Sequence, residues 1–257
     1  MIAPALRIAA DSAADLFVGS SCVGCGRPGR MLCAACRGAL PAEARVCWPT
    51  PVPAGLVTPW AVAEYADAVR QMVVGHKDEG QWGFRGTLAG MLATAVAAAV
   101  REAPVEEPVV LVPVPSRPGS ARRRGYDPTG ALVRAAARRL AAAGRPVVVA
   151  VLLASSAGVR DQAGLGATDR ATNLARSMSC PAGRVRRLAR RHPAGHVVVC
   201  DDVLTTGATA REAQRALAAV GIQPLAVATV AATRRRGGVG THSEVSGGLL
   251  SSLRGKG

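Results

Sequence analysis

Aromatic residues are scarce in this chain, at 3% of its 257 residues. Nearly half of the residues are hydrophobic, so a full core is available, but Val, Leu and Ala must build it. Proteins that hold single-stranded nucleic acid by base stacking need aromatic side chains. The scarcity therefore argues against a stacking platform for nucleic acid.

Long apolar runs are missing too. The most membrane-like stretch, residues 87–100, has about 14 residues and is mostly Ala, whereas a transmembrane helix needs about 20. We expect a buried helix there and no membrane insertion. A secretory signal consists of a basic region followed by a long apolar run. Residues 1–10 do not contain this pattern. These observations predict a cytoplasmic protein.

Acidic residues and lysines are few. The chain has 17 Asp and Glu against 32 Lys and Arg, a net charge of +15, and its only lysines are Lys77 and Lys256. The arginine excess has two explanations: codon usage in a GC-rich genome, or anionic partners such as phosphates, nucleotides or nucleic acid. Because arginines crowd residues 184–191 and 234–236, the second explanation predicts weak, salt-sensitive binding of single-stranded DNA.

Four of the seven cysteines form a double CxxC array near the N-terminus. Cys22 and Cys25 are followed, after seven residues, by Cys33 and Cys36. Two such pairs place four thiolates around Zn²⁺ and leave no position for water, which is typical of a structural site. Disulfides are rare in the cytoplasm, so we predict a zinc-ribbon-like module over residues 21–50. Thr50 stands where Cys47 would need a CxxC partner, so no second metal site is expected.

The remaining chain alternates between apolar runs and helical patterns. Continuous apolar runs at residues 109–114, 146–153, 196–200 and 224–230 predict strands buried on both faces of a parallel sheet. Helical patterns at residues 128–143 and 208–220 separate them. Such alternation predicts an α/β domain with a parallel sheet flanked by helices. We place it at residues 60–233, after an N-terminal segment of residues 1–20 and the cysteine module, and before a disordered basic tail of residues 234–257.

One segment carries chemistry at every position. The strand predicted at residues 197–200 delivers Asp201 and Asp202 to its carboxyl end, where open α/β sheets bind ligands. A loop of small residues then leads into a helix, and helix N-termini attract phosphate. These residues are Thr205, Thr206, Gly207, Ala208 and Thr209. An Asp pair beside a phosphate loop favours a sugar phosphate, because the carboxylates accept hydrogen bonds from sugar hydroxyls or share a divalent cation.

This segment resembles the signature of the type I phosphoribosyltransferases. The resemblance implies their fold and a site for 5-phosphoribosyl-1-pyrophosphate (PRPP) or a ribose-5-phosphate nucleotide. Asp201 and Asp202 would bind the ribose hydroxyls, the loop of residues 205–209 would hold the 5′-phosphate, and Mg²⁺ would arrive with the pyrophosphate.

Further motifs resemble one family in particular, the ComF proteins, which combine a zinc ribbon with a phosphoribosyltransferase-like domain. The motifs are the VPVPSR run of residues 112–117, the RRRGYD run of residues 122–127, the residues Gln162, Leu165, Arg170 and Asn173, and the cysteine array. By this resemblance Ser116 and Arg117 lie in the pyrophosphate loop, and Arg160 and Gln162 lie in a loop that covers the ligand. Asp127 and Pro128 stand where the family has Asn-Gln; if that pair positions a substrate base, base specificity differs here or is lost.

Two functions follow from the resemblance. The first is enzymatic: transfer of phosphoribose to an unknown base, with Arg160 and Gln162 as the candidate catalytic residues. The second is not enzymatic: an accessory of DNA uptake (natural competence) that acts with a helicase and single-stranded DNA. The zinc ribbon and the positive charge fit the second function as well as the first.

Overall fold

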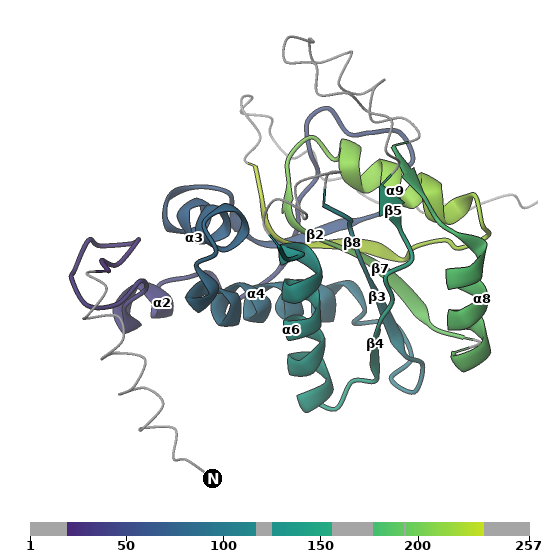
Figure 1. Cartoon of the computed structure of the whole chain (residues 1–257), viewed down its shortest axis with the longest axis horizontal. Helices are drawn as coiled ribbons and strands as arrows, with labels where there is room; N and C mark the ends of the chain where they lie inside the picture. Colours follow the sequence, from purple (N-terminus) through teal and green to yellow (C-terminus); the bar gives the residue numbers. More distant parts are fainter. Residues whose placement is uncertain (1–19, 117–124, 156–176, 193, 234–257) are drawn as a thin grey trace, which may run out of the picture.

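The computed structural model describes residues 20–116, 125–155, 177–192 and 194–233, in the arrangement drawn in Figure 1. The strands are β1 (Arg45–Val46), β2 (Pro59–Glu64), β3 (Val109–Pro113), β4 (Val147–Val149), β5 (Ala154–Ser155), β6 (Met178–Ser179), β7 (His196–Leu204) and β8 (Ala226–Ala232). The helices are α2 (Ala34–Gly38), α3 (Asp67–Asp78), the 3₁₀ turn η1 (Trp82–Phe84), α4 (Arg85–Ala99), α6 (Pro128–Ala142), α8 (Ala182–Arg191) and α9 (Ala208–Ala218).

Six strands form the central sheet, in the order β1-β2-β8-β7-β3-β4. All neighbouring pairs in it are parallel except β1 with β2. β1 comes from the range predicted for the cysteine module and extends the sheet at its edge. The expectation of a mostly parallel sheet flanked by helices, with a small cysteine module near the N-terminus, is confirmed.

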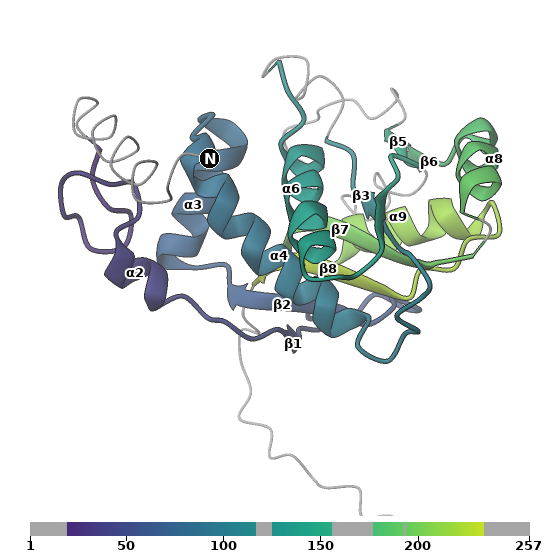
Figure 2. The same cartoon turned by 90° about the horizontal axis from the view of Figure 1, so that it is seen from below.

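Successive residues of the central strands face two separate hydrophobic cores, as the alternation of side chains in a strand requires. In β7, Val198 belongs to the core under α3, α4 and α6, and Val199 belongs to the core under α9. Figure 2 shows α4 and α6 together over one face of the sheet. The continuous apolar runs of β3, β7 and β8 are therefore explained by helices on both faces.

The two ends of the sheet differ in their surroundings. The cysteine module and α3 lie at one end of the molecule, and α8 lies at the other (Figures 1 and 2). Within the described parts of the chain, no helix combines the length and apolar character needed to cross a membrane.

Several local expectations needed correction. A buried strand was predicted over residues 146–153, but β4 has three residues and is only half-buried, because it lies at the sheet edge with a single strand neighbour. The strand predicted to end at residue 200 continues to Leu204, because β8 pairs with it along that whole length. The predicted tail and N-terminal segment lie outside the described residues.

Candidate functional site

The candidate site lies at the point in the sheet where the strand order reverses. β3 and β7 are paired neighbours, but the next strand after β3 is β4 on one side, and the next strand after β7 is β8 on the other. The connecting helices α6 and α9 pack into different cores and so cover opposite faces of the sheet. Open α/β sheets bind ligands in the crevice that such a reversal leaves at the carboxyl ends of the strands.

The carboxylate pair lies in the last part of β7. The backbone N–H of Asp202 donates to Asp201 Oδ1 at 2.8 Å, and that of Val203 donates to Asp202 Oδ1 at 2.9 Å. Asp202 is buried and Asp201 is half-buried. Loss of solvation raises the pKa of Asp201 well above its usual value, and the neighbouring carboxylate of Asp202 raises it further. The pair therefore resists carrying two full negative charges.

A lysine that the sequence analysis did not single out completes this pair. Lys77, in the last turn of α3, places its Nζ 2.6 Å from Asp202 Oδ2. Desolvation lowers the pKa of Lys77, but the carboxylates of Asp202 and Asp201 outweigh it and the net shift is upward. Its rarity was the only signal in the sequence, because Lys77 is one of just two lysines.

The loop after β7 leads into α9 through small residues. Thr205 and Thr206 are exposed, and Thr206 Oγ1 accepts from the Ala208 N–H at 3.4 Å. Gly207 precedes α9 with a φ of 74°, in the left-handed region, and provides no side-chain cap. The Ala208 N–H therefore has a weak local partner, whereas the following N–H groups of the first turn, beginning with that of Thr209, are available to an anion.

The connector between the cysteine module and the sheet packs against this loop. A Cβ added to Gly207 would lie 3.0 Å from Pro49 Cγ and 3.2 Å from Pro53 Cγ. Arg211 Nε of α9 donates to the Ala54 carbonyl at 2.8 Å, and Gln214 Nε2 donates to the Gly55 carbonyl at 2.8 Å. These contacts attach the connector to the start of α9 and to its first two turns.

The end of β3 supplies the other wall. The N–H of Val114 donates to the Cys200 carbonyl at 2.9 Å, so the chain leaving β3 runs beside the start of the Asp pair. Ser116 follows two residues later. Its Oγ is buried and has no hydrogen-bond partner among the described residues. An unpaired buried hydroxyl is costly, so this group is a candidate donor to a ligand oxygen.

The structure also shows the base of the predicted covering loop. β5 and β6 pair as a short antiparallel ribbon that brackets residues 156–176. Ser155 Oγ donates to the Ser116 carbonyl at 3.1 Å. On the other side, the buried carboxylate of Glu212 accepts from the Met178 N–H at 2.9 Å. Arg117, Arg160 and Gln162 themselves lie outside the described residues.

The four predicted metal ligands come together at the far end of the molecule. The sulfurs of Cys22, Cys25, Cys33 and Cys36 all lie within 4.8 Å of one another, and Cys25 Sγ is 3.8 Å from Cys33 Sγ. Four thiolates at about 2.3 Å from a zinc ion in a tetrahedron are about 3.8 Å apart. The cysteines are thus positioned to hold a metal ion, and their spacing fits zinc. Cys47 is not part of the cluster.

Backbone N–H groups favour the thiolate form of Cys22, one of these four cysteines. The N–H groups of Gly24 and Cys33 each donate to Cys22 Sγ at 3.4 Å. Desolvation raises the pKa of Cys22, but these backbone hydrogen bonds outweigh it and lower the pKa to about 6. Conversely, the neighbouring thiols raise the pKa of Cys36 to about 12, because crowded sulfurs without a cation do not all ionise. A metal ion supplies the charge that lets all four bind as thiolates.

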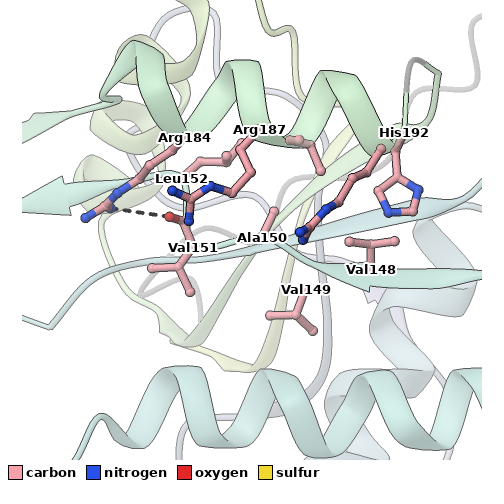
Figure 3. Close-up of a pocket in the computed structure, with 10 residues that line it drawn as sticks. Val148, Val149, Ala150, Val151, Leu152, Arg184, Arg187 and His192 are labelled. Atoms are coloured by element: carbon pink, nitrogen blue, oxygen red, sulfur yellow. Dashed lines mark hydrogen bonds between the residues drawn. The ribbon is translucent and has the colours of Figure 1, made fainter.

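A basic groove lies between α8 and the edge strand β4 (Figure 3). It has a volume of about 380 Å³. Arg184, Arg187 and Arg191 line it, together with His192 and the backbone around Val149 and Val151. Arg184 Nη1 donates to the Leu153 carbonyl at 2.7 Å and so ties α8 to this segment. Three of the arginines predicted to contact anions therefore line a concave surface, and their spacing of three and four residues puts them on one helix face.

No family model matches the chain. It is similar to Competence protein F of Haemophilus influenzae, with 27% identity over 166 residues, which cover 65% of this chain and 69% of the relative. This similarity, together with the four-cysteine cluster, confirms the resemblance to the ComF family.

Proposed function

We propose that this chain is a phosphoribosyltransferase-like protein that binds PRPP or a ribose-5-phosphate nucleotide between the carboxyl ends of β3 and β7. One arrangement supports the proposal above all. The Asp201–Asp202 pair is followed, after a short loop, by the start of α9, where the N-cap residue Gly207 is in the left-handed region and offers no side-chain cap. Carboxylates that accept from hydroxyls next to N–H groups that donate to an anion suit a molecule with a diol and a phosphate, which ribose 5-phosphate is.

The roles divide along the crevice. Asp201 and Asp202 would accept hydrogen bonds from the ribose 2′- and 3′-hydroxyls, and the loop of residues 205–209 would hold the 5′-phosphate. The buried, unpartnered Ser116 hydroxyl, with Arg117, would meet the pyrophosphate. Mg²⁺ prefers oxygen ligands and typically takes several from substrate phosphates. The pyrophosphate would therefore supply most of its ligands, and the bound ion would neutralise part of the pyrophosphate's charge.

The reaction that such a site supports is transfer of the phosphoribosyl group. A nitrogen of the base forms a bond to the anomeric carbon, the bond from that carbon to pyrophosphate breaks, and pyrophosphate leaves with the electron pair. The protein contributes position and charge rather than a covalent intermediate. Arg160 and Gln162, in the loop that starts from β5 and β6, are the candidates to cover the ligand and exclude water.

Ligand-induced stabilisation tests the binding proposal. PRPP with Mg²⁺ at about 100 times its Kd should stabilise the fold by ~2.7 kcal/mol, which is a rise in melting temperature of roughly 5–10 °C for a domain of this size. The Asp201→Asn/Asp202→Asn variant should lose this rise and still fold. Glu107→Gln is the matched control, because Glu107 contacts His196 at the other end of β7. An unchanged rise in the double variant would refute the site assignment.

We also propose that the four-cysteine cluster holds one structural zinc ion. The sulfur spacing fits a tetrahedral site, and all four positions are filled by protein. We propose with it that the chain has two parts: a zinc-ribbon-like module at residues 21–50 and a ligand-binding domain at residues 60–233. Zinc would stabilise a segment that is too small to build a core of its own.

A second function is favoured by the basic groove and by the name of the relative. We propose that the chain acts in DNA uptake and handles single-stranded DNA together with a helicase, with the groove between α8 and β4 contacting the phosphate backbone. Backbone contacts by arginine give affinity without sequence preference and a steep loss with salt.

Two variants of equal charge test this second function. Arg187→Gln/Arg191→Gln removes two groove arginines, whereas Arg186→Gln/Arg190→Gln removes two arginines of the same helix that do not line the groove. Titration of fluorescent single-stranded DNA across a salt series should show weaker binding and a shallower salt slope for the first variant only. Equal losses in both variants would leave net charge, not the groove, as the cause. Binding that does not change with salt would reject the electrostatic mechanism.

A further inference from the structure

Lys77 is the one cation in the described structure that makes a direct ion pair with the carboxylate pair of the proposed ribose site. Its Nζ lies 2.6 Å from Asp202 Oδ2, and its side chain is 36% exposed while that of Asp202 is 10% exposed. The ammonium thus reaches the crevice, but the carboxylate it pairs with is almost fully removed from water. Breaking such a pair leaves an uncompensated buried charge, which folded proteins avoid.

The position of Lys77 depends on a well-anchored helix end. His76, the preceding residue, is buried, and its carbonyl accepts a hydrogen bond from the Tyr126 hydroxyl. The Tyr126 ring in turn meets the Trp82 ring edge-on, with centroids 5.9 Å apart. A cation in the last turn of a helix is also favoured by the helix dipole. The ammonium is therefore held at the crevice rather than carried on a freely moving side chain.

The Asp pair poses an electrostatic problem for the proposed ligand. Two adjacent carboxylates stand beside a cradle that is meant to receive a phosphate dianion. Like charges at short range in a partly buried site repel strongly. A cation beside the pair relieves this repulsion while both carboxylates stay ionised, and a divalent metal that arrives with a pyrophosphate would be one such cation. Ribose 5-phosphate and simple nucleoside monophosphates bring no pyrophosphate to hold one.

We infer that Lys77 is a built-in counter-cation for the Asp201–Asp202 pair, which lets the site bind ribose 5-phosphate monoesters without a divalent metal. The inference rests on the proposed function and deepens it by naming the ligand class that binds metal-free. Lys77 acts through the carboxylates and is a positioning residue. It keeps Asp202 ionised and oriented for a ribose hydroxyl, and it reduces the negative charge that the phosphate meets on entry. Binding of PRPP, with its pyrophosphate, still gains from Mg²⁺.

The binding test uses ribose 5-phosphate and isothermal titration calorimetry, once with EDTA, in protein whose zinc content metal analysis shows to be retained, and once with Mg²⁺. The full-length protein should bind in EDTA. Lys77→Met should bind at least tenfold more weakly in EDTA and recover most of that loss in Mg²⁺, whereas Lys77→Arg should bind like the parent in both. Lys256→Met is the matched control, since Lys256 is the only other lysine. Lys77→Met binding in EDTA as tightly as the parent would overturn the inference, and so would a loss that Mg²⁺ does not reduce.

A second measurement needs no ligand and separates this inference from the proposed function. Acetic anhydride acetylates free amines, and with only two lysines each rate is read from a single peptide. Lys77 should react slowly relative to Lys256, and Asp202→Asn should speed its reaction several-fold, because the ion pair holds the ammonium form. An unchanged rate would overturn the inference even if ribose 5-phosphate binds. A raised rate with no binding of ribose 5-phosphate or PRPP in any condition would instead refute the proposed function. Circular dichroism confirms that each variant folds, and Lys77→Gln replaces Lys77→Met if the latter does not.

Discussion

Gly24 is the position where a single methyl group should disturb the metal site most directly. An ideal Cβ on residue 24 would lie 2.7 Å from Cys36 Sγ and 3.0 Å from Cys36 Cβ. Non-bonded carbon contacts are normally about 3.5–4.0 Å long, so in Gly24→Ala the Cys36 sulfur must retreat by roughly 1 Å. Ligand distances in a sound metal site agree with their standard values to within about 0.2 Å. The fold cannot keep both the methyl group and the cluster geometry.

The size of the effect follows from that displacement. Removing groups that merely orient zinc ligands typically weakens zinc binding about 10–100-fold, and displacing a ligand itself should cost at least as much. A loss of 10–100-fold corresponds to ~1.4–2.7 kcal/mol. Because the metal would stabilise this small module, Gly24→Ala should also lower its resistance to proteolysis.

Competition with a chromophoric chelator measures zinc affinity directly. The matched control is Gly38→Ala, at the end of α2, where an added Cβ meets nothing within 4 Å and φ is not in the left-handed region. The control should bind zinc like the parent. If Gly24→Ala also holds one zinc per chain at parental affinity, then Cys36 does not sit against Gly24 in the metal-bound protein, and the reasoning from this geometry fails.

Three further outcomes are expected. Cys47→Ser should leave the zinc content unchanged in metal analysis, because Cys47 lies outside the cluster; a loss of zinc would make it a ligand. Glu212→Ala should lower the free energy of unfolding in urea by about 2 kcal/mol, since its buried carboxylate holds the Met178 N–H and the half-exposed Arg215 guanidinium; an unchanged value would contradict this. The pKa of Asp201 is raised in the folded protein, so this group stabilises the fold at low pH and that stabilisation is lost as the pH rises from about 4 through the folded pKa. Urea unfolding at a series of pH values should show this loss in the parent and not in Asp201→Asn.

The amino-acid sequence by itself determined those elements whose structure depends on residues close together in the chain. The apolar runs that became β3, β7 and β8 were evident because strands buried on both faces need no alternation. The cysteine array was evident because ligand spacing within a short segment nearly defines a metal site. The Asp pair and the loop of residues 205–209 were evident because strand, turn and helix start are consecutive in the chain.

Tertiary structure alone decided what depends on residues far apart in the chain. Lys77 meets Asp202 only because α3, which packs against η1, α4 and α6, brings its last turn within reach of β7, and no local pattern around Lys77 signals that contact. β4 was predicted as a long buried strand because its apolar run is indistinguishable from that of a central strand; its position at the edge leaves it short and half-buried. The contact of Pro49 and Pro53 with Gly207 likewise joins residues that are far apart in the chain, so no local pattern predicted it. The periodicity of a sequence indicates whether a residue is buried, but it does not indicate which residues lie against it. The net charge of the candidate site depends on those neighbours, because Lys77 is one of them.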